Sequence, residues 1–270
     1  MKMLPLLCLL MLSFTACQKE TSTKQAQEEI AGMTANKQEK ITVCHYDAIS
    51  GTSKTIQVSQ QSLAGHLGHG DLKGDCSQVL VTICDQDWMA RNLDVSTYRN
   101  GDVIPEITDP TAWNDLRTGA WCYYENNSAN GPIYGKLYNW HAVNDPRGLA
   151  PSGWHVPTDD EWTTLSNCLG GDAVAGGKLK SVGTIEAGTG LWYEPNGAAI
   201  NSTGFTGLPA GWRQSDNTFD LKGYVEIWHS SSEEDVGITA FVRSLYYAHG
   251  FFNRGSTGMR EGLSVRCLRD

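Results

Sequence analysis

The densest group of potential metal ligands in the sequence lies between Cys44 and Cys76. Its members are His45, His66, His69 and Asp71. Zinc is bound tetrahedrally by imidazole nitrogen, thiolate sulfur and carboxylate oxygen, so this set could form a site. If the two cysteines are joined in a disulfide, as an exported protein favours, only histidine and aspartate ligands remain. We therefore favour structural or hydrogen-bonding histidines over a metal site, and we predict no cofactor.

A second pattern is typical of sugar binding. Glu194-Pro195-Asn196 matches the Glu-Pro-Asn motif with which calcium-dependent lectins hold an ion and sugar hydroxyls, and Trp113-Asn114-Asp115 matches its partner motif. In those lectins the partner motif follows Glu-Pro-Asn, whereas here it precedes it. We interpret the match as a coincidence.

Aromatic side chains near the C-terminus form the candidate ligand-binding set. They are Trp228, Tyr246, Tyr247, Phe251 and Phe252. Their rings could stack on sugars, and they could equally close the hydrophobic core. Ser230–Asp235, which follows Trp228, is polar and is predicted to be a solvated loop.

No pattern in the sequence indicates catalysis. His141, His155, His229 and His249 are far apart, with no Gly-x-Ser-x-Gly or His-Glu-x-x-His motif around them. No glycine-rich loop has the phosphate-binding form. We predict no catalytic residue, and we do not expect an enzyme.

The clearest structural element is a short capped helix over Asp159–Leu169. Thr158 is a suitable N-cap, and Glu161 completes a capping box. Trp162 and Leu165 lie on one face together with Leu169. Because so short a helix is marginal alone, this face must pack on a core.

The other predicted elements suggest two folded parts, a small Cys/His module over residues 41–78 and a main domain over residues 79–270. In the module we expect strands at Ile41–Tyr46 and Lys54–Val58 and a short helix through Leu63 and Leu67. In the main domain we expect a helix at Leu137–Val143 and long loops over Gly183–Gly211. The strands predicted there are Val79–Ile83, Trp88–Asn92, Tyr224–Trp228, Gly237–Tyr247 and Leu263–Leu268.

The N-terminal residues indicate export and anchoring. Residues 1–16 have one basic residue, Lys2, before an apolar run, which is typical of a signal peptide. The run ends at Cys17 in a sequence similar to a bacterial lipobox, so we predict lipidation of Cys17, with an ordinary cleaved signal peptide as the alternative. Residues 17–40 have few large apolar side chains and are predicted to be the anchor and a disordered tether.

Composition limits the partners. With 30 acidic and 21 basic residues, the chain has a net charge of −9, which repels phosphate backbones and makes nucleic acid a poor partner. Outside the predicted signal peptide and Cys17, the cysteines are even in number, which favours disulfides in an oxidising compartment. They are Cys44, Cys76, Cys84, Cys122, Cys168 and Cys267.

Several ordered motifs resemble one known family. They include Asp87–Leu93, Tyr134–Trp140, Pro151–Trp162, Gly204–Gly211 and Leu263–Cys267. Through these motifs, the stretch from Val79 to Asp270 resembles the Fibrobacter succinogenes major paralogous domain family. That family is similar to the C-type-lectin-like and sulfatase-modifying-factor group of folds. The resemblance implies an α+β, C-type-lectin-like domain with irregular antiparallel sheets, two or more short helices and long loops, preceded by the cysteine-stapled module. It also implies that the first and last strands, Val79–Ile83 and Leu263–Leu268, lie side by side.

The resemblance bears on the cysteines as well. Relatives carry a cysteine where this chain has Ala150, so Cys267 has lost its customary partner, and either Cys84 or Cys168 could reach it. We expect Cys44 to pair with Cys76 and the other four cysteines to pair within the main domain. The cysteine pair of the sulfatase-modifying relatives is missing, since only Cys267 lies in the matching region.

Together these features favour a lipoprotein of the outer membrane that faces the cell exterior. We expect a non-enzymatic binding or adhesion protein, with glycans or polysaccharide as the first candidate ligand. One alternative is a protein–protein or structural component of the cell surface, and another is a modifying enzyme.

The lipid anchor gives the first prediction. Cys17→Ser should release the protein from the membrane fraction, because it removes the only residue predicted to carry lipid. Membrane fractionation and the mass of the mature N-terminus measure this. Unchanged membrane association without lipid mass on the parent would contradict it.

Overall fold

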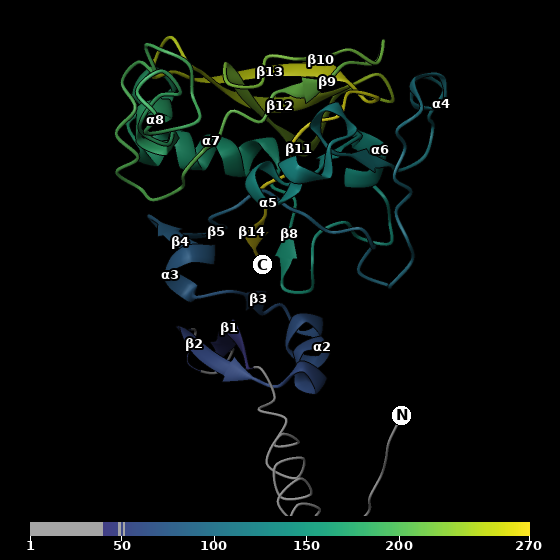
Figure 1. Cartoon of the computed structure of the whole chain (residues 1–270), viewed down its shortest axis with the longest axis vertical. Helices are drawn as coiled ribbons and strands as arrows, with labels where there is room; N and C mark the ends of the chain where they lie inside the picture. Colours follow the sequence, from purple (N-terminus) through teal and green to yellow (C-terminus); the bar gives the residue numbers. More distant parts are fainter. Residues whose placement is uncertain (1–39, 48–49, 51) are drawn as a thin grey trace, which may run out of the picture. The chain divides into compact units, whose positions relative to one another are not determined.

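The computed structural model of the chain describes residues 40–47, 50 and 52–270 (Figure 1). Residues 40–270 form one compact unit. The predicted signal peptide, Cys17 and most of the tether lie outside the described residues. Among the described residues, no helix has the length and apolar character needed to cross a bilayer.

The small module is a three-stranded antiparallel sheet with a helix at its edge. The sheet has the order β2-β1-β3, with β1 in the centre. Ser59 caps the helix by accepting a hydrogen bond from the backbone N–H of Ser62, as its residue type favours. The Cys44–Cys76 disulfide is present. The elements are β1 (Ile41–Asp47), β2 (Thr52–Val58), α2 (Gln60–Gly68), β3 (Leu72–Lys73) and α3 (Cys76–Val79).

The first sheet of the main domain brings the two ends of that domain together. Its order is β4-β5-β14-β8, for β4 (Leu80–Ile83), β5 (Gln86–Met89), β14 (Leu268–Arg269) and β8 (Trp154–His155). The prediction that the first and last strands are direct neighbours is wrong, because the tight turn between β4 and β5 places β5 between them. The predicted last strand is also shorter, and its residue Leu263 instead forms a bridge to Tyr138.

The second sheet contains the longest strands, in the order β11-β12-β13. These are β11 (Val225–Asp235), β12 (Thr239–Tyr246) and β13 (Phe252–Gly258). The prediction of a loop at Ser230–Asp235 is wrong, since β11 continues through it to pair with β12 across two register shifts. Ser230 is fully buried, the next three residues are partly buried, and only Glu234 and Asp235 are exposed.

Helix α7 (Asp159–Cys168) has the predicted capping box. The Thr158 hydroxyl accepts from the Glu161 N–H at 3.3 Å, and the Thr158 N–H donates to the Glu161 carboxylate at 2.8 Å. Trp162 is fully buried, with its ring centroid 4.5 Å from that of Trp88 and 5.9 Å from that of Trp228. The helix thus packs between the two sheets' aromatic residues, and α8 (Asp172–Leu179) follows it.

The remaining elements are short. The predicted helix at Leu137–Val143 divides into a strand and a helix, because Asn139 caps a new helix start. The predicted loops over Gly183–Gly211 contain no helix or strand. The short elements are α4 (Pro110–Asn114), β6 (Trp121–Cys122), η1 (Tyr124–Asn126), η2 (Ser128–Asn130), α5 (Gly131–Tyr134), β7 (Leu137–Tyr138), α6 (Trp140–Val143), β9 (Trp212–Arg213) and β10 (Phe219–Asp220).

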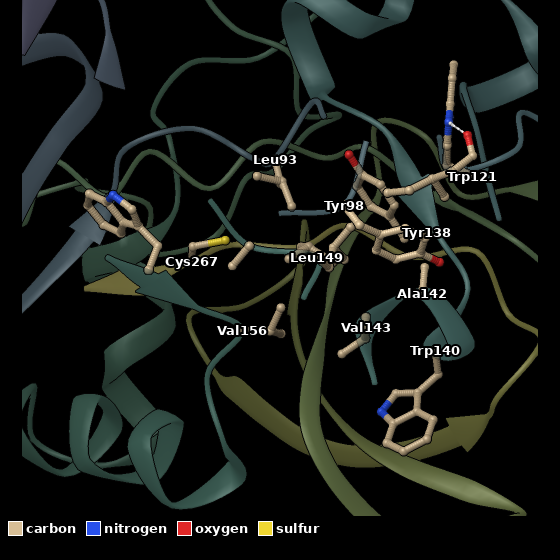
Figure 2. Close-up of a cluster of buried hydrophobic side chains, with 14 of the residues drawn as sticks. Leu93, Tyr98, Trp121, Tyr138, Trp140, Ala142, Val143, Leu149, Val156 and Cys267 are labelled. Atoms are coloured by element: carbon tan, nitrogen blue, oxygen red, sulfur yellow. Dashed lines mark hydrogen bonds between the residues drawn. The ribbon is translucent and has the colours of Figure 1, made fainter. Parts of the chain in front are cut away.

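The architecture is α+β, with several small antiparallel sheets around aromatic-rich clusters. Figure 2 shows one such cluster, in which Tyr98, Tyr138 and Trp140 gather with Cys267. A second cluster contains Trp88, Trp162 and Trp228. The aromatic residues of the sequence thus form the core of the main domain.

The cysteine prediction is correct in part. Cys84, which follows β4, is bonded to Cys168 at the end of α7, and both are exposed. Cys122 and Cys267 are free thiols, so the expectation that these two also form disulfides is wrong. The reason is their location, since they are fully buried in two different hydrophobic clusters.

Burial of the helix face gives the second prediction. Trp162→Ala should lower the free energy of unfolding by about 3–5 kcal/mol, because it removes a large buried ring. Urea denaturation measures the change. The control Val182→Ala, at a side chain that is 53% exposed, should change it by less than about 0.5 kcal/mol. A Trp162→Ala protein as stable as this control would contradict the packing.

The third prediction concerns the cysteines. Non-reducing peptide mapping should find Cys44 joined to Cys76 and Cys84 joined to Cys168. Burial raises the pKa of Cys122 and of Cys267 to about 12, so iodoacetamide at neutral pH should modify both only after denaturation. A peptide that joins Cys267 to another cysteine would refute this arrangement. Rapid alkylation of Cys267 in the native protein would also refute it.

Candidate functional site

The turn between β12 and β13 presents aromatic rings to solvent. Tyr246 and Phe251 are 37% and 49% exposed. The His249 ring lies between them, with centroids 5.7 Å from Tyr246 and 4.6 Å from Phe251. This set, Tyr246, His249 and Phe251, is called the aromatic turn.

A buried lysine holds the aromatic turn in place. Lys180, which follows α8, is fully buried and donates hydrogen bonds of 2.8 Å to the carbonyl oxygens of Gly197, Tyr246 and His249. Burial lowers the pKa of Lys180 to about 8. Because all three bonds end on backbone, this side chain fixes the conformation of the turn and of the loop that contains Gly197.

Glycines allow the neighbouring segments to pack against the turn backbone to backbone. A Cβ atom at Gly176 would overlap the carbonyl oxygen of Phe251, and one at Gly197 would overlap that of Ala248. The aromatic turn is therefore supported closely from α8 and from the loop before Gly197. Such support predicts a rigid surface.

A second set of rings adjoins the aromatic turn through Tyr247, which packs partly against the core cluster around Trp162. Tyr193 and Tyr224 are stacked with centroids 4.3 Å apart, and Tyr247 meets Tyr224 edge to face at 5.0 Å. The backbone N–H of Tyr247 donates to the carbonyl oxygen of Tyr224 at 2.9 Å. Tyr247 follows Tyr246 directly, so it links these rings to the aromatic turn.

Two predicted ligand-binding residues are core residues instead. Trp228 and Phe252 are fully buried in the cluster around Trp162. Trp228 also donates through its indole N–H to the side chain of Asn92 at 2.9 Å. Side chains alternate along a strand, so Phe252 faces the core while its neighbour Phe251 faces solvent.

The lectin-like motif has a structural role in this fold. Asn196 is buried, and its amide donates to the carbonyl oxygens of Ser181 and Gly183 at 3.0 and 2.9 Å. Trp113 of the partner motif is buried and donates to the carbonyl oxygen of Arg260. These bonds account for the Asn196 amide nitrogen and the Trp113 indole, while Asn196 Oδ1 is buried without a hydrogen-bond partner among the described residues.

His155 and His229, which lie outside the module, are held by separate partners. His155 lies between Glu161 and Asp270, at 3.0 and 2.8 Å. His229 is fully buried and pairs with the carbonyl oxygen of Tyr138 at 2.8 Å, and burial lowers its pKa to about 4. Neither arrangement places a nucleophile beside a base.

The histidines of the module, in contrast, are brought together around Asp71. His45 and His66 each place Nδ1 within 2.8 Å of Asp71 Oδ2, and His69 Nδ1 is 3.6 Å from Oδ1. Burial alone raises the pKa of Asp71, but hydrogen bonds from the Tyr46 N–H and the two nearer imidazoles hold it below its usual value. The carboxylate is therefore ionised at neutral pH.

Sequence reasoning missed two features. One is the role of Lys180, because nothing in the surrounding sequence indicates that its side chain supports a distant turn. A cavity of about 520 Å³ between the module and the main domain was also missed, because its walls come from distant segments. Its apolar walls include Leu67, Leu72, Met89, Leu93, Val95 and Leu149.

Comparison with known proteins adds the family. The family model described as Fibrobacter succinogenes major domain matches residues 81–269. No curated protein and no solved structure matches the chain significantly.

Proposed function

The chain belongs to the Fibrobacter succinogenes major domain family, and we propose that it is a non-enzymatic binding or adhesion protein that recognises glycans at the bacterial cell surface. The observation that carries this proposal is the aromatic turn of Tyr246, His249 and Phe251. Exposed aromatic groups on a rigid support are a recurrent feature of binding surfaces.

The rigidity of the turn favours binding. A ligand that must order a flexible loop binds less tightly, because ordering the loop costs conformational entropy. A preformed surface avoids this cost. Lys180 and the backbone contacts at Gly176 and Gly197 preform the turn. Aromatic faces suit sugars, because one face of a pyranose ring carries mainly C–H groups.

Charge favours a neutral glycan. The chain has a net charge of −9, so it repels polyanions over a Debye length. Glu194 lies exposed in the loop that Lys180 joins to the turn, while Lys180 itself is fully buried. Uronic-acid polymers and nucleic acids are therefore disfavoured relative to neutral polysaccharide.

Location and fold complete the proposal. We place the protein on the outer membrane, held by lipid on Cys17 and raised by residues 17–40, with its folded part facing the exterior. We also assign the main domain to the C-type-lectin-like group. In support, its first hairpin, β4-β5, and its last strand, β14, share one sheet.

The fourth prediction tests glycan binding by the full chain. Neutral β-glucan and mannan oligosaccharides, with polygalacturonate as the anionic comparison, are titrated by calorimetry. Phe251→Ala and Tyr246→Ala should each weaken binding to a neutral glycan by about tenfold, since one buried ring face contributes about 1–2 kcal/mol. Thermal melting should show both variants to be folded.

The matched controls are Val236→Ala and Ile238→Ala, at exposed apolar residues in the β11–β12 hairpin. They should leave glycan binding unchanged. Equal binding by the parent and the Phe251→Ala variant, or capture of a surface protein that free glycan does not inhibit, would contradict the proposal.

A further inference from the structure

Three imidazoles surround one buried carboxylate in the small module. Asp71 is fully buried, whereas the side chains of His45, His66 and His69 are 27%, 22% and 53% exposed. The ring centroids are 5.4 to 5.7 Å apart. One potential ligand atom from each of the four residues lies within 4.8 Å of the others. The cluster is therefore compact and reachable from solvent.

The local fold of the module brings the three histidines and Asp71 close together. His45 lies in β1, His66 lies in the last turn of α2, and His69 is the C-cap of that helix. Gly70 then turns the chain with a φ of +95°, a conformation that favours glycine. The pairing of β1 with β3 brings Asp71 beside His45.

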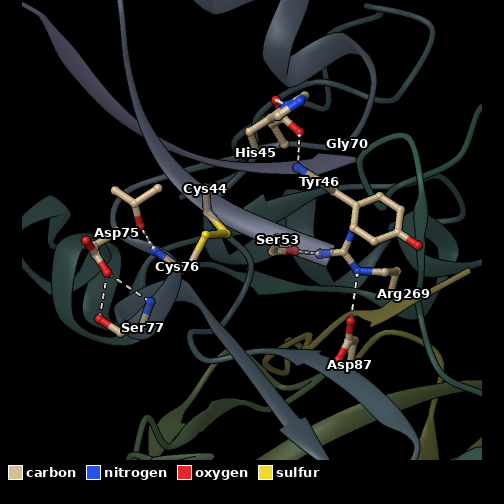
Figure 3. The surroundings of a disulfide bond; sticks show 12 residues. Cys44, His45, Tyr46, Ser53, Gly70, Asp75, Cys76, Ser77, Asp87 and Arg269 are labelled. Carbon is tan, nitrogen blue, oxygen red and sulfur yellow. Dashed lines mark hydrogen bonds and ion pairs between the residues drawn. A yellow bond between two sulfur atoms is a disulfide. The ribbon is translucent and has the colours of Figure 1, made fainter. Parts of the chain in front are cut away.

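Asp71 is held in one orientation. The backbone N–H of Tyr46 donates to Oδ1 at 2.9 Å, and Oδ2 faces the imidazoles of His45 and His66. A ligating carboxylate that is itself hydrogen-bonded is the usual arrangement around a metal. Figure 3 shows His45 and Tyr46 beside the disulfide that anchors this strand.

Hydrogen bonding to Asp71 accounts for His45 and His66 but leaves His69 without a bond to the carboxylate. Two imidazoles share the single oxygen Oδ2, and the third remains 3.6 Å from Oδ1, beyond an ordinary hydrogen bond. A cation at the centre would engage all four groups at once. We propose that His45, His66, His69 and Asp71 bind one divalent transition-metal ion, with zinc as the ion that the site fits best.

The donor set selects the kind of metal. Calcium and magnesium prefer shells of oxygen ligands, whereas imidazole suits zinc and its transition-metal neighbours. Cys44 and Cys76 are joined to each other and donate no thiolate. Four protein ligands close the tetrahedral shell, which is typical of a structural site.

The geometry requires a small rearrangement of the four side chains. Zinc–nitrogen bonds of about 2.0–2.1 Å give ligand atoms about 3.3 Å apart in a tetrahedron. The widest pair would close by about 1.5 Å from the 4.8 Å limit. The Nδ1 atoms of His45 and His66, now 2.8 and 2.7 Å from Asp71 Oδ2, would move away from that oxygen by about 0.5 Å. The ion would join β1, α2 and the turn before β3.

The fifth prediction is stoichiometric zinc binding. The full chain, purified without a histidine tag and treated with a chelator, is titrated with zinc chloride by calorimetry. One equivalent should bind per chain, and zinc should raise the melting temperature. Cobalt chloride should give the strong visible absorption of a tetrahedral complex, and one equivalent of zinc should abolish it.

Variants separate the cluster from other histidines. His69→Gln and His66→Gln should each weaken zinc binding by at least about tenfold, because losing even a residue that only supports a ligand typically costs about 10–100-fold in metal affinity. The control His141→Gln, at a histidine outside the cluster, should bind zinc like the parent. His69→Gln is expected to stay folded, because His69 is half-exposed and is the residue farthest from Asp71.

Two results would overturn the proposal. One is the absence of saturable zinc binding by folded parent protein whose Cys44–Cys76 disulfide is intact. The other is equal zinc affinity of the parent and the folded His69→Gln and His66→Gln variants. Neither result depends on glycan binding, so this site and the aromatic turn are tested separately.

Discussion

The main domain depends on the side chain of Asn92, which is hydrogen-bonded through both ends of its amide. The amide nitrogen donates to Glu226 and Ser264 at 2.9 and 3.1 Å, and the oxygen accepts from Trp228 and Arg266 at 2.9 and 2.8 Å. Glu226 and Arg266 are buried, and burial raises the pKa of Glu226 to about 7. Buried polar groups are tolerated only when every partner is present, so this network requires the segment after β5, β11 and the C-terminal segment to assemble together.

The sequence predicts well those features that local chemistry determines. The capping box of Thr158 and Glu161 needs only residues within one turn of a helix, and the structure shows it. The sequence predicts the order of strands in the sheet less well, since β5 lies between the first and last strands. Which strand takes the middle position depends on the turn after β4 and on the Asn92 network, and neither leaves a periodic signal.

The candidate sites show the same division. The spacing of His66 and His69 already indicated a cluster, but only the β1–β3 pairing reveals Asp71 as its centre. Phe251 and Phe252 are indistinguishable by type, and the strand that begins at Phe252 decides which of them is exposed. The burial of Cys122 and Cys267 in separate clusters likewise depends on the whole fold, whereas counting cysteines suggests a pair.

The small module is joined to the main domain through the residues around its histidine cluster. Arg269 of the last strand lies 4.0 Å over the ring of Tyr46, whose N–H holds Asp71, and it also pairs with Asp87 at 3.3 Å (Figure 3). Trp154 of β8 donates to the carbonyl oxygen of Gly70 at 2.8 Å. Both contacts reach the β4-β5-β14-β8 sheet, so separating the module would expose a guanidinium face and an indole N–H that are now satisfied. A metal bound at Asp71 would therefore stabilise the main domain together with the module, because the backbone that positions its ligands is also the backbone that the sheet contacts.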